Sequence, residues 1–73
     1  MTMRARRKPT ARQLEVLATY ARTGSYKITA EELGIARGTV GTTLGMIRAR
    51  YSAETTIQAY RAAVSAGHLR RSA

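Results

Sequence analysis

Residues 28–44, "ITAEELGIARGTVGTTL", contain the spacing that decides the fold of this 73-residue chain. Gly34 separates two segments with helical patterning, and glycine readily takes the positive φ that a tight turn between helices needs. Beyond it, apolar residues recur at i, i+4 and i+7 on one face of a helix: Val40, Leu44 and Ile47. The stretch therefore predicts two helices joined by a short turn, the second running over about 37–50.

Three residues of this stretch match the fifth, ninth and fifteenth positions of the helix-turn-helix pattern: Ala30, Gly34 and Val40. Ala30 has to be small because the two helices cross closely there. Gly34 allows the turn, and Val40 anchors the second helix in the core. The spacing favours a helix-turn-helix unit, with a plain helical hairpin of an α-bundle as the alternative.

The second of these helices is unusually rich in glycine. Gly38, Gly41 and Gly45 lie at i, i+3 and i+7 on one side of it, although each interior glycine costs a helix about 1 kcal/mol relative to alanine. We interpret this side as an exposed face on which the backbone comes close to DNA. Two alternatives stay open: the glycines have no role and the free helix frays, or the face packs against a helix of another protein.

Start and stop signals bound four helices, and no segment has the alternation of a strand. Capping boxes of the form T-x-x-Q open the first and the last helix: Thr10 with Gln13, and Thr55 with Gln58. The second helix begins after Ser25 or after Thr29, and its expected range is about 26–33. Gly24, Gly34 and Gly67 read as stops. We expect an all-α domain over 10–69, a basic flexible arm over 1–9 and a basic tail over 70–73.

Charge is the dominant compositional feature. Thirteen Lys and Arg against four Asp and Glu give a net charge of +9, which favours a polyanionic partner, most commonly nucleic acid. With no cysteine, one histidine and scattered carboxylates, we expect no metal, no cofactor, no small-molecule ligand and no enzymatic activity. No apolar run reaches the ~18 residues of a membrane span, and "MTMRARRKP" lacks a signal-peptide core. We therefore expect a soluble cytoplasmic protein without a membrane partner.

Motifs in three parts of the chain carry a family resemblance: Thr10, Arg12, Gln13, Glu15, Val16 and Leu17 at the start; Ala30, Leu33, Ile35, Thr39 and Val40 in the middle; Ala59, Ala63 and Gly67 at the end. From Thr10 to Leu69 the chain resembles the LuxR/GerE-type DNA-binding domain. The resemblance implies a four-helix DNA-binding domain that often pairs through its last helix, and several such domains stand alone.

The chain departs from this family pattern on the third helix. Gly41, Thr42 and Thr43 stand where polar or basic residues are usual, and Gly45 where a lysine is frequent. Arg50 replaces a usual lysine. The family's lysine contacts to bases therefore do not carry over to this chain.

Candidate DNA-binding residues lie on the arm, before the turn and on the third helix: Arg4, Arg6, Arg7, Lys8, Lys27, Arg37, Gly38, Thr39, Gly41, Thr42, Gly45, Arg48 and Arg50. We expect Arg37, Thr42 and Arg48 to read bases, and Thr39 and Arg50 to contact phosphates. The arm either tracks phosphates or a minor groove, or is simply a solvated terminus.

The last helix has an apolar arc wider than one core contact requires. Because excess apolar surface on a small domain often marks a partner, we expect a homodimer whose interface includes Ile57, Arg61, Ala62 and Val64.

These observations together predict a sequence-specific transcriptional regulator that places residues 37–50 in the major groove of double-stranded DNA, as a dimer. Its length and basic arm would suit a phage or mobile-element regulator. Two alternatives stay open. One is an interaction protein that resembles a sigma-factor promoter-reading domain and binds polymerase or another regulator. The other is an architectural or recombination-directionality protein that coats DNA.

Overall fold

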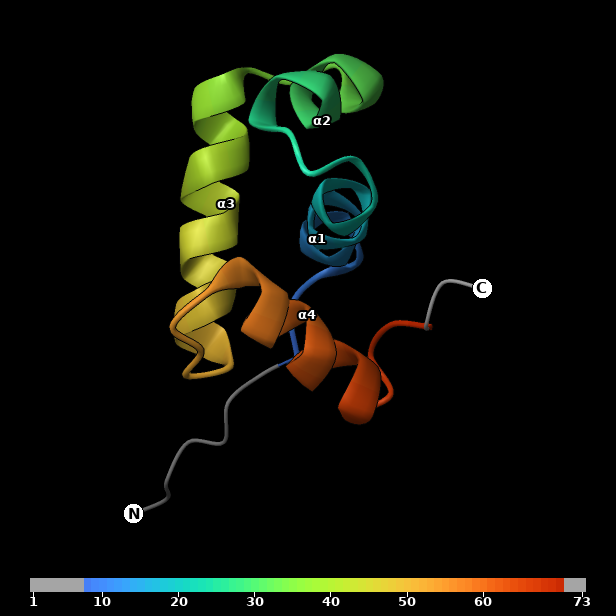
Figure 1. Cartoon of the computed structure of the whole chain (residues 1–73), viewed down its shortest axis with the longest axis vertical. Helices are drawn as coiled ribbons and strands as arrows, with labels where there is room; N and C mark the ends of the chain where they lie inside the picture. The colour runs from blue at the N-terminus through green and yellow to red at the C-terminus, as the bar shows by residue number, and fades with distance from the viewer. Residues whose placement is uncertain (1–7, 71–73) are drawn as a thin grey trace.

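Four helices form the fold of the computed structural model, which describes residues 8–70 (Figure 1): α1 (Ala11–Thr23), α2 (Tyr26–Leu33), α3 (Arg37–Arg50) and α4 (Thr56–Ser65). Residues 8–70 contain no strand, so the predicted all-α class is confirmed. In Figure 1, α3 stands along one side of the molecule, with α2 across one end and α4 near the other. Within the described chain, α1 and α3 each contact all the other helices, whereas α2 and α4 do not meet.

Side-chain caps set where α1 and α4 begin. The Thr10 hydroxyl accepts from the Gln13 N–H at 3.1 Å, and the Gln13 carboxamide accepts from the Thr10 N–H at 2.9 Å, so the predicted capping box is confirmed. Thr55 caps α4 in the same way, accepting from the Gln58 N–H at 3.1 Å. The second box is incomplete, however, because the Gln58 side chain accepts from the N–H of Glu54, one residue before the cap.

The start and end of α2 orient the helix that follows. Ser25 caps α2 by accepting from the Ile28 N–H at 3.0 Å, which settles the start that the sequence left open between Ser25 and Thr29. At the other end Gly34 has φ 67°. The next N–H, of Ile35, reaches back to the Ala30 carbonyl at 3.0 Å, the longer bond of a Schellman motif. The expected stop at Gly34 is confirmed, and the chain turns into α3 within three residues.

All four helices contribute to the core, and its buried apolar residues are Leu14, Val16, Leu17, Ala30, Val40, Leu44, Ile47, Ala59 and Ala63. Val40, Leu44 and Ile47 are 0–1% exposed, as the helical spacing predicts. Pro9 is also fully buried, although the sequence assigns it to the arm. The packed part of the chain therefore begins at Pro9.

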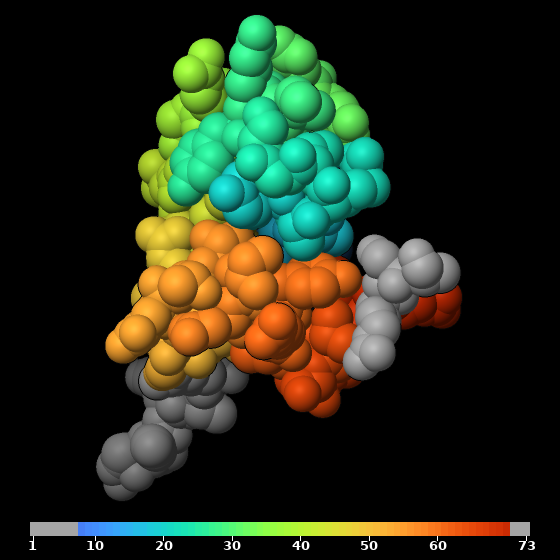
Figure 2. All heavy atoms as spheres, viewed as in Figure 1, coloured from blue at the N-terminus to red at the C-terminus, as the bar shows by residue number. Residues whose placement is uncertain are grey.

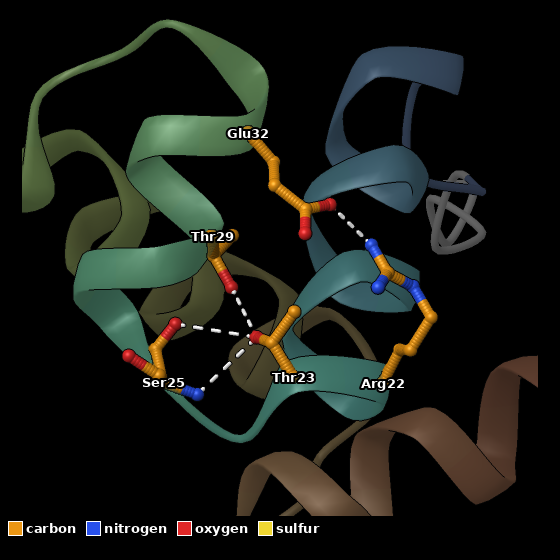
Figure 3. Close-up of polar contacts among 5 residues, drawn as sticks. All are labelled: Arg22, Thr23, Ser25, Thr29 and Glu32. Atoms are coloured by element: carbon orange, nitrogen blue, oxygen red, sulfur yellow. Dashed lines mark hydrogen bonds and ion pairs between the residues drawn. The ribbon is translucent and has the colours of Figure 1, made fainter.

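A polar cluster joins the end of α1 to α2 (Figure 3). Thr29 is fully buried, and its hydroxyl shares a hydrogen bond of 2.9 Å with the hydroxyl of Thr23, which also accepts from the Ser25 N–H at 3.3 Å. On the surface, Arg22 and Glu32 form an ion pair between the same two helices. Because a buried hydroxyl without a partner is costly, these bonds hold the start of α2 in one position against α1.

Candidate nucleic-acid interface

Helix α3 has one face in the core and the other exposed. Gly38, Thr39, Thr42, Met46 and Ala49 are exposed on the side opposite the buried apolar residues. The helix carries three arginines and no acidic residue. Helix α3 is therefore positively charged and has one face exposed to solvent.

The start of α3 adds to this charge. Its N-cap residue, Ala36, makes no side-chain cap hydrogen bond, so no side chain competes for the N–H groups of the first turn. The helix dipole places partial positive charge at the same end. Arg37 and Lys27 are both exposed. These features suit the binding of anionic groups such as phosphates.

The three glycines of α3 do not form one uniformly open face. A Cβ at Gly38 would have no neighbour within 4 Å, and one at Gly45 would meet only the Arg48 guanidinium, at 3.7 Å. A Cβ at Gly41 would lie 3.3 Å from the ring of Tyr26. The prediction of an exposed glycine face thus needs correction, because Gly41 and Gly45 are both half-buried and only Gly38 is exposed.

Tyr26 explains the glycine at position 41. It is the first residue of α2, and its ring packs edge-to-face against Tyr20 of α1 with 5.3 Å between centroids. The ring also covers Gly41 on α3. Glycine therefore makes room for an aromatic contact among three helices. The sequence reasoning missed this contact because nothing in the spacing of α3 reports what α2 places against it.

The arginines of α3 differ in their surroundings. Arg48 is half-buried and donates to the Thr56 hydroxyl at 3.1 Å, which ties the end of α3 to the first residue of α4. The structure therefore gives Arg48 a bridging contact besides the base-reading role expected from sequence. Arg37 is exposed, and Arg50 is half-buried. On other helices, Arg12 forms an ion pair with Glu15 and Arg22 forms one with Glu32.

The junction between α3 and α4 is held from two directions. The Tyr51 hydroxyl and His68 Nδ1 are 2.7 Å apart, so the residue after α3 is hydrogen-bonded to the turn after α4. Burial raises the pKa of the Tyr51 phenol above its ordinary value, and the nearby charge of Arg50 opposes this rise. This hydrogen bond and the one from Arg48 to Thr56 both join the end of α3 to α4 and the turn after it.

A groove between α1 and α4 lies away from α3, and the residues that line it are Ala21, Arg22, Ile57, Tyr60, Arg61, Val64 and Ser65. In Figure 2 the exposed side of α4, in orange, faces the viewer below the end of α1 and α2. Three of the four expected interface residues, Ile57, Arg61 and Val64, line this groove, and Ile57 is 49% exposed. Ala62 does not line it.

The remaining sequence expectations concern the arm and ligands. Arg4, Arg6 and Arg7 lie outside the described residues, whereas Lys8 is described and exposed. Among residues 8–70, no group of three or more His, Asp or Glu side chains could hold a metal ion. Within the same residues, no helix has the length and apolar character needed to cross a membrane. Comparisons with protein-family models, with curated proteins and with solved structures gave no match for this chain.

Proposed function

We propose that this chain is a sequence-specific DNA-binding transcriptional regulator of the LuxR/GerE helix-turn-helix type. The observation that carries the proposal is α3 itself: it is anchored in the core by Val40, exposed on its opposite face, and free of acidic residues. The residues expected to shape a helix-turn-helix unit also support it. Ala30 is 7% exposed between the two helices, and Gly34 takes the left-handed conformation at the turn.

In this proposal α3 enters the major groove, whose width admits a helix. Arg37, expected from the sequence to read bases, is assigned here to a phosphate because it is the first residue of α3, at the positive end of the helix dipole. Together with Arg50 and Lys27 it supplies the sequence-independent part of the affinity. Gly38 has open space around it, and the only side chain near Gly45 is that of Arg48, so the backbone of α3 can approach the bases or sugars closely. The polar cluster that fixes α2 against α1 keeps α3 in one orientation during binding.

The groove between α1 and α4 supports the second part of the proposal, a homodimer. Ile57 and Val64 give it apolar surface, and Arg61 also lines it. A two-fold contact through α4 would present two copies of α3 to successive turns of DNA, about 34 Å apart. The proposed operator is therefore a pair of inverted half-sites separated by about one helical turn.

Selection of bound duplexes from a random pool, followed by footprinting on the selected sequence, tests this function. One bounded footprint over inverted half-sites supports the regulator. Graded coverage without a boundary points instead to an architectural protein that coats DNA. Absence of any DNA affinity points to an interaction protein that binds polymerase or another regulator, and overturns the proposal.

A matched pair of variants assigns the binding to α3. Arg37→Ala removes an exposed cation at the start of α3 and should weaken binding to the selected duplex about tenfold, as expected for one lost charge-assisted hydrogen bond. Arg70→Ala removes the same charge at the end of the described chain, which lies across the molecule from α3 (Figure 1). It should have a much smaller effect. Equal losses of DNA affinity in both variants would argue against α3 as the helix that contacts DNA.

A further inference from the structure

An exposed line of methyl-bearing side chains runs along α3. Met46 is one of four large hydrophobic residues that the described chain leaves exposed, at 46%. Thr39 and Thr42 are also exposed, and the three residues lie at i, i+3 and i+7, so they share one side of the helix. Nearly half of the Met46 surface is therefore accessible to a partner. Together with the two threonines it gives α3 an exposed line of methyl groups.

Two of the three arginines of α3 lie off this line, and the third, Arg50, follows Met46 at i+4 as the last residue of the helix, where the proposed function has it contact phosphate. Taking about 100° per residue, Arg37 and Arg48 project on the side of Gly41, and Arg48 is already bonded to Thr56. From Thr39 to Met46 the line contains no Arg, Lys, Asn, Gln or acidic residue. These are the side chains that pair with the hydrogen-bonding edges of guanine, adenine and cytosine. What the line offers to a base edge is methyl groups and two hydroxyls.

Only one standard base presents a methyl group in the major groove, and that base is thymine. We propose that Thr39, Thr42 and Met46 read thymine methyl groups, so that the preferred half-site has thymines under the middle of α3. This inference rests on the proposed function, because it requires α3 to lie in the major groove. It gives that function a specificity: apolar recognition of thymine in place of bidentate recognition of guanine.

Replacing thymine by uracil in the selected duplex tests the inference, because this removes only the methyl group and leaves base pairing unchanged. Replacing one thymine that contacts the line should lower the affinity of the protein for the duplex about three- to fivefold. This is the effect expected when one apolar group of this size is lost from a buried contact. Replacement of thymines outside the half-sites should have no effect. Affinities are measured by fluorescence anisotropy at one fixed salt concentration.

Protein variants connect the effect to these side chains. Thr42→Ser removes one methyl group and keeps the hydroxyl, and Met46→Ala shortens an exposed side chain, so both should fold normally. In each variant one uracil replacement should lose its effect, which is the signature of a direct contact in a double-mutant cycle. Ile28→Ala is the matched control: Ile28 is 45% exposed on α2, and its removal should leave the response to uracil unchanged.

Two outcomes overturn the inference in different ways. Failure to select any bound duplex overturns the proposed function, and this inference with it. A selected duplex that is bound equally well with uracil at every thymine position overturns the inference alone and leaves the proposed function standing. A response to uracil that persists at full size in Thr42→Ser, Met46→Ala and Thr39→Ser also overturns it.

Discussion

Replacing glycine by alanine at two positions of α3, Gly45 and Gly41, and at Gly34 in the turn before it should give three different stability effects, set by what the new Cβ meets and by the backbone conformation. At Gly45 the nearest atom would be the Arg48 guanidinium at 3.7 Å, an ordinary contact. Gly45→Ala should therefore show the full gain in helix propensity, about 1 kcal/mol. For a domain of this size, that gain raises the melting temperature by about 4–8 °C.

At Gly41 the same change should gain less. The Cβ would lie 3.3 Å from the Tyr26 ring, so the ring has to move by a few tenths of an ångström before the propensity gain appears. Tyr26 is 38% exposed and can make that movement, at some cost to its contact with Tyr20. We expect Gly41→Ala to raise the free energy of unfolding by at most half as much as Gly45→Ala does.

Gly34→Ala is the control with the opposite sign. Gly34 has φ 67°, a conformation that alanine adopts only with strain, so this variant should lose about 1 kcal/mol or more. Thermal and urea unfolding followed by circular dichroism measure all three variants. Equal stabilisation by Gly41→Ala and Gly45→Ala would refute the Tyr26 contact. Loss of stability in Gly45→Ala would refute the claim that a Cβ at Gly45 makes only an ordinary contact with Arg48.

Three further predictions concern other parts of the molecule. Val64→Glu places a charge in the groove between α1 and α4 and should abolish cooperative binding to two half-sites, whereas Ala62→Glu, outside the groove, should leave it intact; sedimentation and mobility shifts measure both. Tyr51→Phe removes the hydrogen bond to His68 and should cost about 1 kcal/mol in urea unfolding; unchanged stability would show that the bond contributes nothing. Deleting residues 1–8 should flatten the salt dependence of DNA binding if the arm contacts phosphates, and an unchanged slope would leave the arm as a solvated terminus.

Local signals in the sequence were sufficient to predict the helices and many of the buried core residues. Thr10 and Ser25 cap their helices because a side-chain oxygen bonds an N–H only three residues away, and such contacts follow from sequence spacing alone. Val40, Leu44 and Ile47 are buried together because helical periodicity puts them on one face. The all-α class and the bounds of α2 and α3 follow from the same local signals.

Contacts between helices were not predictable in this way. Periodicity along α3 shows on which side Gly41 lies, but not that α2 places Tyr26 there. Likewise, Arg48 bonds Thr56 because α4 begins beside the end of α3, and no spacing rule reports this. Thr29 looks like a helix cap from its residue type, yet it is buried because Thr23 offers its hydroxyl a partner. Which side chains contact one another around the candidate interface therefore depends on how the helices pack.

The most direct test of the account is a titration of the intact protein against the selected duplex at several salt concentrations. If α3 and its surrounding cations neutralise about six phosphates, the logarithm of the affinity should fall with the logarithm of the salt concentration with a slope near −5. Between 50 and 200 mM salt, the affinity should then fall about a thousandfold. No binding at 50 mM salt, or an affinity that does not change with salt, would contradict the proposal that this chain is a DNA-binding protein.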